Sequence, residues 1–304
     1  MQTLRISAFL FVVVIIGISC RSSISCDFLV ASDLHYNGTI ERSIILDSAI
    51  TKMNQASLIP FLNQSKKSLN PFGVFITGDI TESGRKEEWA QFENSFGINA
   101  DKKLMMPVFE TFGNHDGSVG GVVREAIKLR NLARNTNRKT SQNNLHYSFN
   151  KGGIHFAVLG SYPGNIWDPE CDWCKYFNNS FHVAEMSLEF LKKDLEQNLD
   201  YENQPVILLF HYGWDNFSLL WWTEKEQEDF YEVIKNANIT GIFHGHNHSV
   251  GHYIWKDIDI WSAGSPQTEN GVGVFLGVKI TNDSITVSSF NQDQWEPVSS
   301  KAIR

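Results

Sequence analysis

Ile239-Thr240-Gly241-Ile242-Phe243-His244-Gly245-His246-Asn247-His248 joins an apolar run to three histidines at alternate positions. The apolar part predicts a buried strand. Because alternate side chains of an extended backbone point the same way, the three histidines could project to one side of the strand's end. Neutral imidazole is the commonest nitrogen ligand of transition metals. The stretch alone fits a metal site or a polar loop whose histidines bind their neighbours, so partners elsewhere must decide.

Four further apolar runs lead into polar residues that can bind metals. The runs occupy residues 27–32, 71–78, 106–112 and 205–210, and each predicts a buried strand. The polar residues that follow them are Asp33 and His35, Asp79, Asn114 and His115, and His211. In α/β proteins, ligands gather beyond the carboxyl ends of such strands. We therefore expect these strand ends to meet at one site with His246 and His248.

Helical patterns lie between the predicted strands, which is typical of α/β proteins. The expected helices cover residues 43–62, 88–96, 122–134, 180–199 and 224–236. A hairpin is expected at residues 146–159 around Lys151-Gly152-Gly153, and antiparallel strands at 253–261 and 272–287, the latter around Asn282-Asp283. Residues 162–181 read as a loop. The chain shows no internal repeat or interdomain linker.

The bulk composition is that of an ordinary globular protein. The 304 residues are 42% hydrophobic and 20% charged, and their length fits one larger α/β domain or two small ones. The formal net charge is -8, and no long basic run is present. This balance disfavours a nucleic-acid partner. It does not disfavour a small phosphorylated substrate, because bound metal ions would reverse the local field.

Residues 1–19 predict a secretory signal peptide. Arg5 supplies a positive start, and residues 8–18 form an apolar segment too short for a comfortable membrane span. Cleavage before Cys20 or Cys26 would leave no membrane span. We expect a secreted protein or one in the lumen of the secretory pathway. An uncleaved anchor, lipidation of Cys20, or a periplasmic location in a bacterium are the alternatives.

The cysteines and glycosylation motifs agree with export. Cys20, Cys26, Cys171 and Cys174 allow three pairings, and we expect Cys171-Asp172-Trp173-Cys174 to hold a structural disulfide, either local or to the N-terminal cysteines. Acceptor motifs that predict a glycoprotein occur at Asn37, Asn63, Asn178, Asn216, Asn238, Asn247 and Asn282. Asn247 lies within the predicted site and is expected to be unmodified.

The residues at the strand ends suit a pair of transition ions. Two carboxylates, one amide oxygen and four histidines fit manganese, zinc or iron better than magnesium or calcium. One carboxylate can bridge two ions about 3.5–4 Å apart. Such a pair makes hydroxide available near neutral pH and binds a phosphate oxygen. A serine or cysteine nucleophile is then unnecessary.

The motifs together resemble those of the calcineurin-like metallophosphoesterase superfamily. The matching blocks are Asp33-Leu34-His35, Gly78-Asp79, Gly113-Asn114-His115-Asp116, His211 and Gly245-His246-Asn247-His248, in the family's order. The resemblance covers roughly residues 27–250. It implies a four-layer α/β/β/α sandwich, two sheets packed face to face with helices outside, which we expect to form one domain over residues 20–304.

The resemblance also implies a role for each residue. Asp33, His35, Asp79 and His248 would hold the first metal. Asp79, as the bridge, would hold the second with Asn114, His211 and His246. His115 would contact the phosphate, as would Asn114, and protonate the leaving-group oxygen. Asp116 would orient His115 or cap the following turn. His244 is expected to satisfy a core hydrogen bond or to support a ligand.

The resemblance points to particular branches of the superfamily and so to a narrower substrate class. Purple acid phosphatases carry an iron-ligating tyrosine, whereas the first block here offers His35, so the chain resembles the phosphodiesterase-like branches. We expect hydrolysis of a small phosphorylated substrate by a metal-bound hydroxide, in a phosphodiesterase. The alternatives are a phosphomonoesterase and a non-catalytic binding protein of the same fold. Such binding proteins tend to lose ligands, which are all present here. The oligomeric state is not predicted.

Other histidines and aromatic residues carry weaker signals. We expect structural or surface roles for His146, His155, His182 and His252. Aromatic residues in the loops after the strands either line a substrate's organic part or cover the core. They are Tyr162, Trp167, Trp173, Trp214, Trp221 and Trp222.

Overall fold

A computed structural model of the protein describes residues 23–61, 68–134, 138–166, 168–177, 181–268, 271–272 and 274–303. Several predictions fall outside the described residues: the signal peptide, its cleavage site before Cys20, the aromatic residue Trp167, and the acceptor motifs at Asn63 and Asn178.

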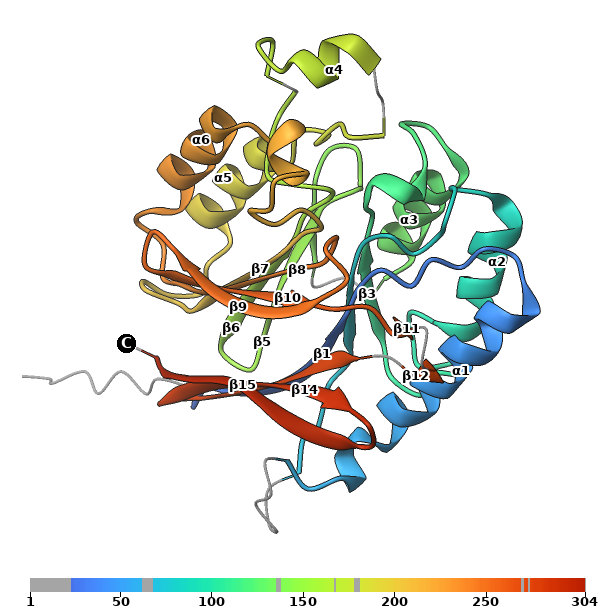
Figure 1. The fold of residues 1–304 in the computed structure, drawn as a ribbon. Helices are drawn as coiled ribbons and strands as arrows, with labels where there is room; N and C mark the ends of the chain where they lie inside the picture. Colours follow the sequence, from blue (N-terminus) through green and yellow to red (C-terminus); the bar gives the residue numbers. More distant parts are fainter. Residues whose placement is uncertain are drawn as a thin grey trace, which may run out of the picture.

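Two β-sheets pack face to face, with helices on both outer sides (Figure 1). One sheet is covered by α1 (Ile40–Gln55), α2 (Lys86–Ser95) and α3 (Val122–Ala133). The other is covered by α5 (Ser187–Gln197) and α6 (Glu224–Ile234). The four-layer α/β/β/α sandwich expected from the resemblance is confirmed.

The first sheet places three strand ends beside one another. Its order is β15 (Gln294–Ala302), β14 (Ser284–Asn291), β13 (Phe275–Thr281), β1 (Ser25–Ala31), β2 (Val74–Thr77) and β3 (Val108–Thr111). Strands β1, β2 and β3 run parallel, and β13 pairs antiparallel with β1. The carboxyl ends of β1, β2 and β3 therefore share one edge.

The second sheet brings the carboxyl ends of two of its strands, β7 and β8, to the same region. Its order is β4 (Lys139–Thr140), β5 (Tyr147–Lys151), β6 (Ile154–Val158), β7 (Val206–Leu209), β8 (Ile239–His244), β10 (Ile258–Ala263) and β9 (Val250–Trp255). Strands β6, β7, β8 and β10 are parallel. A small separate pair is formed by β11 (Gln267–Thr268) and β12 (Gly271–Val272).

Three apolar clusters fill the three interfaces between layers. The central one joins the two sheets through phenylalanines such as Phe28, Phe75 and Phe156, whose rings lie 5.3–5.4 Å apart. The outer clusters join each sheet to its helices. Because β2 and β7 are buried along their whole length on both faces, their sequences are almost entirely apolar, with Thr77 at the end of β2 as the polar position.

Two of the predicted turns are confirmed and one strand prediction is wrong. The confirmed turns are the hairpin β5–β6 and the turn at Asn282-Asp283. The prediction of one continuous strand at 253–261 is wrong, because Lys256 (φ 48°) and Asp257 (φ 65°) form a turn that separates β9 from β10. Two successive positive φ angles match the twist of a two-residue hairpin. The same geometry at residues 292–293 leads into β15, which was not predicted.

Three helices also differ from the expected ranges. Helix α1 begins at Ile40, because the Thr39 side chain accepts the backbone N–H of Arg42 and caps the helix. Helix α5 begins at Ser187, because the preceding residues 185 and 186 have left-handed φ angles of 55° and 63°. Helix α4 (Asp172–Phe177) lies in the stretch predicted as a loop. The predicted cap Ser180 lies outside the described residues.

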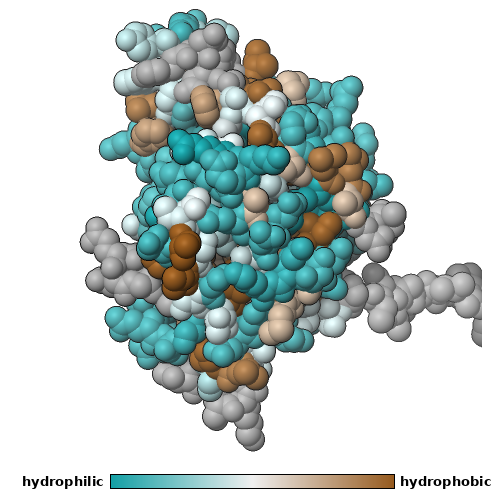
Figure 2. Space-filling view, turned by 90° about the vertical axis from the view of Figure 1, so that its right-hand side faces the viewer, coloured by the Kyte–Doolittle hydropathy of each residue, from teal (hydrophilic) through white to brown (hydrophobic). Residues whose placement is uncertain are grey.

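The face on the right-hand side of Figure 1 is mostly hydrophilic, and its apolar side chains form separate small patches (Figure 2). Among the described residues, no helix has both the length and the apolar composition needed to cross a membrane.

Candidate metal centre

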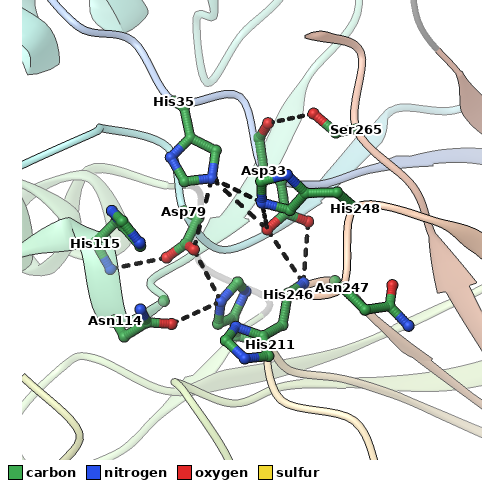
Figure 3. A network of polar contacts seen from close by, with 12 residues as sticks. Asp33, His35, Asp79, Asn114, His115, His211, His246, Asn247, His248 and Ser265 are labelled. Atoms are coloured by element: carbon green, nitrogen blue, oxygen red, sulfur yellow. Dashed lines mark hydrogen bonds and ion pairs between the residues drawn. The ribbon is translucent and has the colours of Figure 1, made fainter. Parts of the chain in front are cut away.

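All seven predicted ligands lie together at the carboxyl ends of five strands (Figure 3). Asp33 follows β1, Asp79 follows β2, and Asn114 begins a 3₁₀ turn after β3. His211 follows β7, and both His246 and His248 follow β8. Residues that are far apart in the sequence thus meet because both sheets present these ends to one place.

One group of ligand atoms comes from Asp33, His35 and His248. The Nε2 atoms of His35 and His248 lie 3.1 Å apart, and His248 Nε2 lies 3.4 Å from Asp33 Oδ1. One ligand atom from each residue lies within 4.8 Å of the others, a spacing that could hold one ion. Asp79 Oδ2 is 3.8 Å from His35 Nε2, so the carboxylate borders this group.

A second group comes from Asp79, His211 and His246, again within 4.8 Å of one another. His211 Nε2 lies 3.2 Å from both Asp79 Oδ2 and Asn114 Oδ1. His211 Nδ1 lies 2.9 Å from the carbonyl oxygen of Thr77, which can only accept, so Nδ1 carries a proton. In a neutral ring this leaves the lone pair on Nε2, which faces the group.

The residues fit a pair of transition ions. The buried Nδ1 of His246 has no hydrogen-bond partner among the described residues, which is costly for a polar atom unless a ligand satisfies it. Burial lowers the pKa of His35 and of His246 to about 3, and it also lowers that of His248. These imidazoles are therefore neutral at neutral pH and have lone pairs to offer.

Protons compensate the buried carboxylates when metal is absent. Burial disfavours the charge on Asp79, but the charge of His211 and its hydrogen bond outweigh burial and lower the pKa of Asp79. Burial would lower the pKa of His211, but the Asp79 carboxylate raises it to about 9. Burial raises the pKa of Asp33 to about 7, an effect to which Asp79 adds. Metal binding must displace such protons.

The metal-free protein is expected to lose stability as pH rises from about 6.5 to 9. The pKa of His211 is raised from 6.5 to about 9 in the folded state. Its contribution to the free energy of unfolding is therefore fully present below pH 6.5 and is lost as the pH rises through 9. Asp33, with its raised pKa, acts in the same direction up to about pH 7. The loss should be on the order of 3 kcal/mol, because a shift of one pKa unit corresponds to about 1.4 kcal/mol. Melting temperatures in chelator should fall over this range, whereas metal should reduce the fall. A constant melting temperature in chelator would contradict this account.

The ligands sit on strained backbone. Positive φ angles occur at Asp33 (54°), His35 (47°), Asp79 (49°), His246 (74°) and His248 (57°). For residues other than glycine this conformation costs about 1–3 kcal/mol each, and it concentrates at functional sites. Backbone hydrogen bonds hold it: the Asp33 N–H donates to Gly78 O, and the His35 N–H to Asp79 O, at 3.1 and 3.0 Å.

Two glycines make the close packing of the centre possible. A Cβ atom at Gly78, which has φ 100°, would lie 2.6 Å from His211 Nδ1. A Cβ atom at Gly245 would lie 1.7 Å from Ser32 Oγ. The absence of a side chain at Gly245 lets the backbone N–H of His246 donate to both oxygens of Asp33, at 3.1 and 3.0 Å. Gly245 therefore lets the ends of β1 and β8 approach each other, and Gly78 does the same for the ends of β2 and β7.

His115 lies at the open side of the centre, with its side chain 40% exposed. Its backbone N–H donates to Asp79 Oδ1 at 2.9 Å, and its ring lies 4.7 Å from that of His35. Asp116 does not bind the imidazole. Its carboxylate instead accepts the N–H groups of Ile80, Thr81 and Gly113, so it braces the loop of His115 against the loop of Asp79.

Glu82 is the neighbour that sequence reasoning missed. Its Oε2 lies 3.0 Å from His35 Nδ1, and its carbonyl oxygen lies 2.8 Å from His115 Nδ1. The carboxylate therefore lies at ion-pair distance behind a candidate ligand, although His35 Nδ1 has no hydrogen-bond partner with good geometry among the described residues. The available signal was an acid three residues after Asp79, inside the turn that also carries Thr81.

His244, the first histidine of the stretch 239–248, lies outside the metal centre, as expected. His244 is buried, with Nδ1 2.8 Å from Gly245 O and Nε2 2.7 Å from the Tyr253 hydroxyl. Both nitrogens are thus occupied in the core. Asn247 points away from the cluster (Figure 3), and its Oδ1 accepts the Ser262 hydroxyl.

The remaining histidines divide into two kinds. His146, His155 and His252 make hydrogen bonds within the fold, which confirms their structural assignment. His182 is also buried, but it lies over the loop that follows His211, next to the centre.

The disulfide is the local one. Cys171 and Cys174 are joined, which selects one of the pairings that the sequence left open, and Cys26 is a buried free thiol. Cys171 Sγ lies 3.2 Å from the carbonyl oxygen of Leu220, so the disulfide packs against the loop after β7.

The sequence around this centre matches a known protein family. The model of the family described as calcineurin-like phosphoesterase matches residues 27–250. The chain belongs to this family. The matched range includes every strand end that contributes to the centre, so the calcineurin-like phosphoesterase core and the candidate metal centre coincide.

Two plant proteins are similar in sequence. Purple acid phosphatase 22 of Arabidopsis thaliana is 26% identical over 219 residues, which cover 69% of this chain and 44% of the relative. Purple acid phosphatase 15 of the same plant is 28% identical over 174 residues, which cover 56% and 28%. The chain thus spans less than half the length of either relative.

Two solved structures share the fold at low sequence identity. A dimetal phosphatase from Danio rerio superimposes with a TM-score of 0.62 at 12% identity, covering 92% of this chain and 99% of the other. GAP50 of Plasmodium, described as the anchor in the inner membrane complex, superimposes with a TM-score of 0.52 at 12% identity, covering 92% of this chain and 89% of the other. Both support the α/β/β/α architecture.

Proposed function

We propose that this calcineurin-like phosphoesterase hydrolyses phosphoesters at a two-metal centre. Asp33, His35, Asp79 and His248 would hold one ion, and Asp79, Asn114, His211 and His246 the other. The observation that carries the proposal is that three overlapping groups of possible ligands lie side by side among the described residues. Asp79 belongs to two of them, one with His211 and His246 and one with His35 and His115, which suits a bridging carboxylate. Manganese, zinc and iron all suit the donor set. Residues 20–304 would act as one domain.

The protein supplies orientation and proton transfer. When bound, the metal pair lowers the pKa of water and polarises a phosphate oxygen. His115 Nδ1 carries a proton, since it faces the carbonyl oxygen of Glu82 at 2.8 Å. Nε2 is thereby left for the substrate, and a protonated His115 could donate from it to the leaving-group oxygen. Asn114 would contact the same phosphate.

The preferred substrate in this proposal is a phosphodiester. The support is the resemblance: purple acid phosphatases are marked by an iron-ligating tyrosine, whereas the first block of this chain offers His35. Phosphomonoesters are the second candidate, because both plant relatives are phosphatases by name. A non-catalytic anchor such as GAP50 is the third reading, and the full set of ligands at the centre argues against it.

We further propose that the protein is exported. The predicted signal peptide and the local disulfide, which persists in oxidising compartments, support this. Asn282, on the turn between β13 and β14, is an exposed acceptor for glycosylation.

The direct test is a substrate panel on metal-depleted protein. Chromogenic monoesters and diesters of one phenol would be assayed after separate addition of manganese, zinc or iron. We expect activity to return with about two ions per chain and to be higher on the diester. Faster monoester hydrolysis would select the phosphatase. Fewer than about one ion per chain, without activity, would select the binding protein.

A further inference from the structure

Aromatic side chains flank the metal centre beside His246. Tyr212, Phe217 and Trp221 come from the loop between β7 and α6, and His182 comes from the segment before α5. The phosphoester chemistry proposed above uses none of them. Tyr212 and Phe217 nevertheless lie directly beside the candidate ligand His246, and Trp221 and His182 pack behind them.

Phe217 is the exposed member of this aromatic face. Its ring centroid lies 4.8 Å from that of His246, and 44% of the residue is exposed. Tyr212 lies 4.8 Å from the same histidine, edge to face, but is fully buried. A molecule bound at the centre would therefore meet the ring of Phe217, with Tyr212 behind it.

The aromatic face is held in place before any ligand arrives. Asp215 accepts the backbone N–H groups of Phe217 and Ser218, both at 3.0 Å, which fixes the start of the 3₁₀ helix η4 (Ser218–Leu220). His182 stacks flat on Trp221, with centroids 3.5 Å apart and planes 1° apart. Its Nδ1 also bonds to the Tyr212 hydroxyl. Preorganised rings lose little entropy on binding.

Arg124 of α3 holds the segment that carries His182. Its guanidinium donates to the carbonyl oxygen of Phe181, at 2.6 Å, and to Glu185 Oε1, at 3.0 Å. The side chain of Arg124 is fully buried. It therefore fixes the segment that carries His182 and is not available to an anion at the surface.

The charge of the face restricts what it can bind. Residues 212–222 contain no lysine or arginine. The nearby carboxylate of Asp215 already accepts the Ser218 hydroxyl at 2.7 Å besides the two backbone groups. A second phosphate or a carboxylate on the substrate would find no cation on this loop. An uncharged ring would find an exposed, fixed aromatic surface.

We propose that this face binds the organic group esterified to the reacting phosphate, and that this group carries a flat, uncharged aromatic or heteroaromatic ring. The inference rests on the proposed phosphoesterase function and narrows its substrate class. Offset or edge-to-face contact with Phe217 would add to the simple burial of apolar area. An aliphatic group of equal size would gain the burial alone.

Binding of phosphonates, which are not hydrolysed, tests the proposal without using turnover. Calorimetry on the full metal-loaded chain would compare phenyl-, cyclohexyl- and methylphosphonate. We expect phenylphosphonate to bind about tenfold more tightly than methylphosphonate and severalfold more tightly than cyclohexylphosphonate. Phe217→Ala should remove most of the phenyl preference and leave methylphosphonate within about twofold. Ile254→Ala, an exposed apolar site on β9, is the matched control.

Each alternative outcome is decisive. Equal binding of the phenyl and cyclohexyl compounds, or an unchanged preference in Phe217→Ala, overturns the aromatic subsite while the phosphoesterase proposal stands. Failure of all three phosphonates to bind a protein that also retains no metal overturns both. Loss of methylphosphonate binding in Phe217→Ala would show that Phe217 supports the metal centre and not the organic group.

Discussion

Replacing Asp79 with asparagine is expected to lower kcat for a chromogenic phosphoester by more than about a hundredfold. Loss of a group that only supports a metal ligand already costs 10–100-fold in affinity or activity. Asp79 stands nearer to the chemistry, because its Oδ2 lies 3.2 Å from His211 Nε2 and 3.8 Å from His35 Nε2. It is the carboxylate that borders both ligand groups.

Asparagine removes the negative charge of Asp79 and keeps the shape of the side chain. The amide retains an oxygen that can accept the backbone N–H of His115, now bound at 2.9 Å. The negative charge that raises the pKa of His211 disappears. The variant should therefore fold, while His211 loses its counter-charge and the ions lose their shared ligand.

Metal content decides whether the lost activity has this cause. Asp79→Asn should retain clearly fewer ions per chain than the wild type after gel filtration, with an unchanged circular dichroism spectrum. Asp47→Asn, which removes an exposed ion pair to Lys103, is the control and should behave as the wild type. Near-normal turnover in Asp79→Asn would refute the two-metal assignment.

The parallel strands were predictable because burial on both faces leaves an unbroken apolar signature. Strands β1, β2, β3, β7 and β8 were all expected close to where they occur. Each is followed by its polar residues, so a rule about strand ends was enough to gather the ligands. The grouping needed no knowledge of which strands pair.

The edges of the sandwich were harder to predict. Strand β15 is largely exposed and alternates weakly, so its sequence lacks the apolar signature of the inner strands. Its pairing with β14 depends on the turn at residues 292–293, and that of β9 with β10 on the turn at residues 256–257. Neither turn contains the glycine that usually marks two positive φ angles.

Contacts made between loops were harder still to predict. Glu82 reaches His35 across 47 positions, and His182 reaches Trp221 across 39 positions, counted from their numbers. Short-range patterns report burial and periodicity, whereas these contacts follow from how two sheets place their loops. The ligands were found by their chemistry, and the residues that orient them required the fold.

Replacing His115 with alanine is expected to slow esters with poor leaving groups by about 10²–10⁴-fold and to affect good leaving groups much less. A general acid contributes this factor when the leaving oxygen needs a proton. The position suits the role, because the side chain is 40% exposed and Glu82 O orients the ring from 2.8 Å at Nδ1. Alanine keeps the backbone N–H that binds Asp79, so the metal ligands should remain in place.

The dependence of rate on the acidity of the leaving phenol separates an acid from a structural residue. A series of substituted phenyl esters should give a steeper dependence in His115→Ala than in the wild type, since the departing oxygen then carries its full negative charge. His252→Ala is a matched control, because His252 is also a partly exposed histidine held by a hydrogen bond, at 2.7 Å from Asp259, but it lies on β9. Equal slowing across the series would remove the acid role and leave His115 as a phosphate contact. A steeper slope, with metal content unchanged, would place proton donation at His115 Nε2.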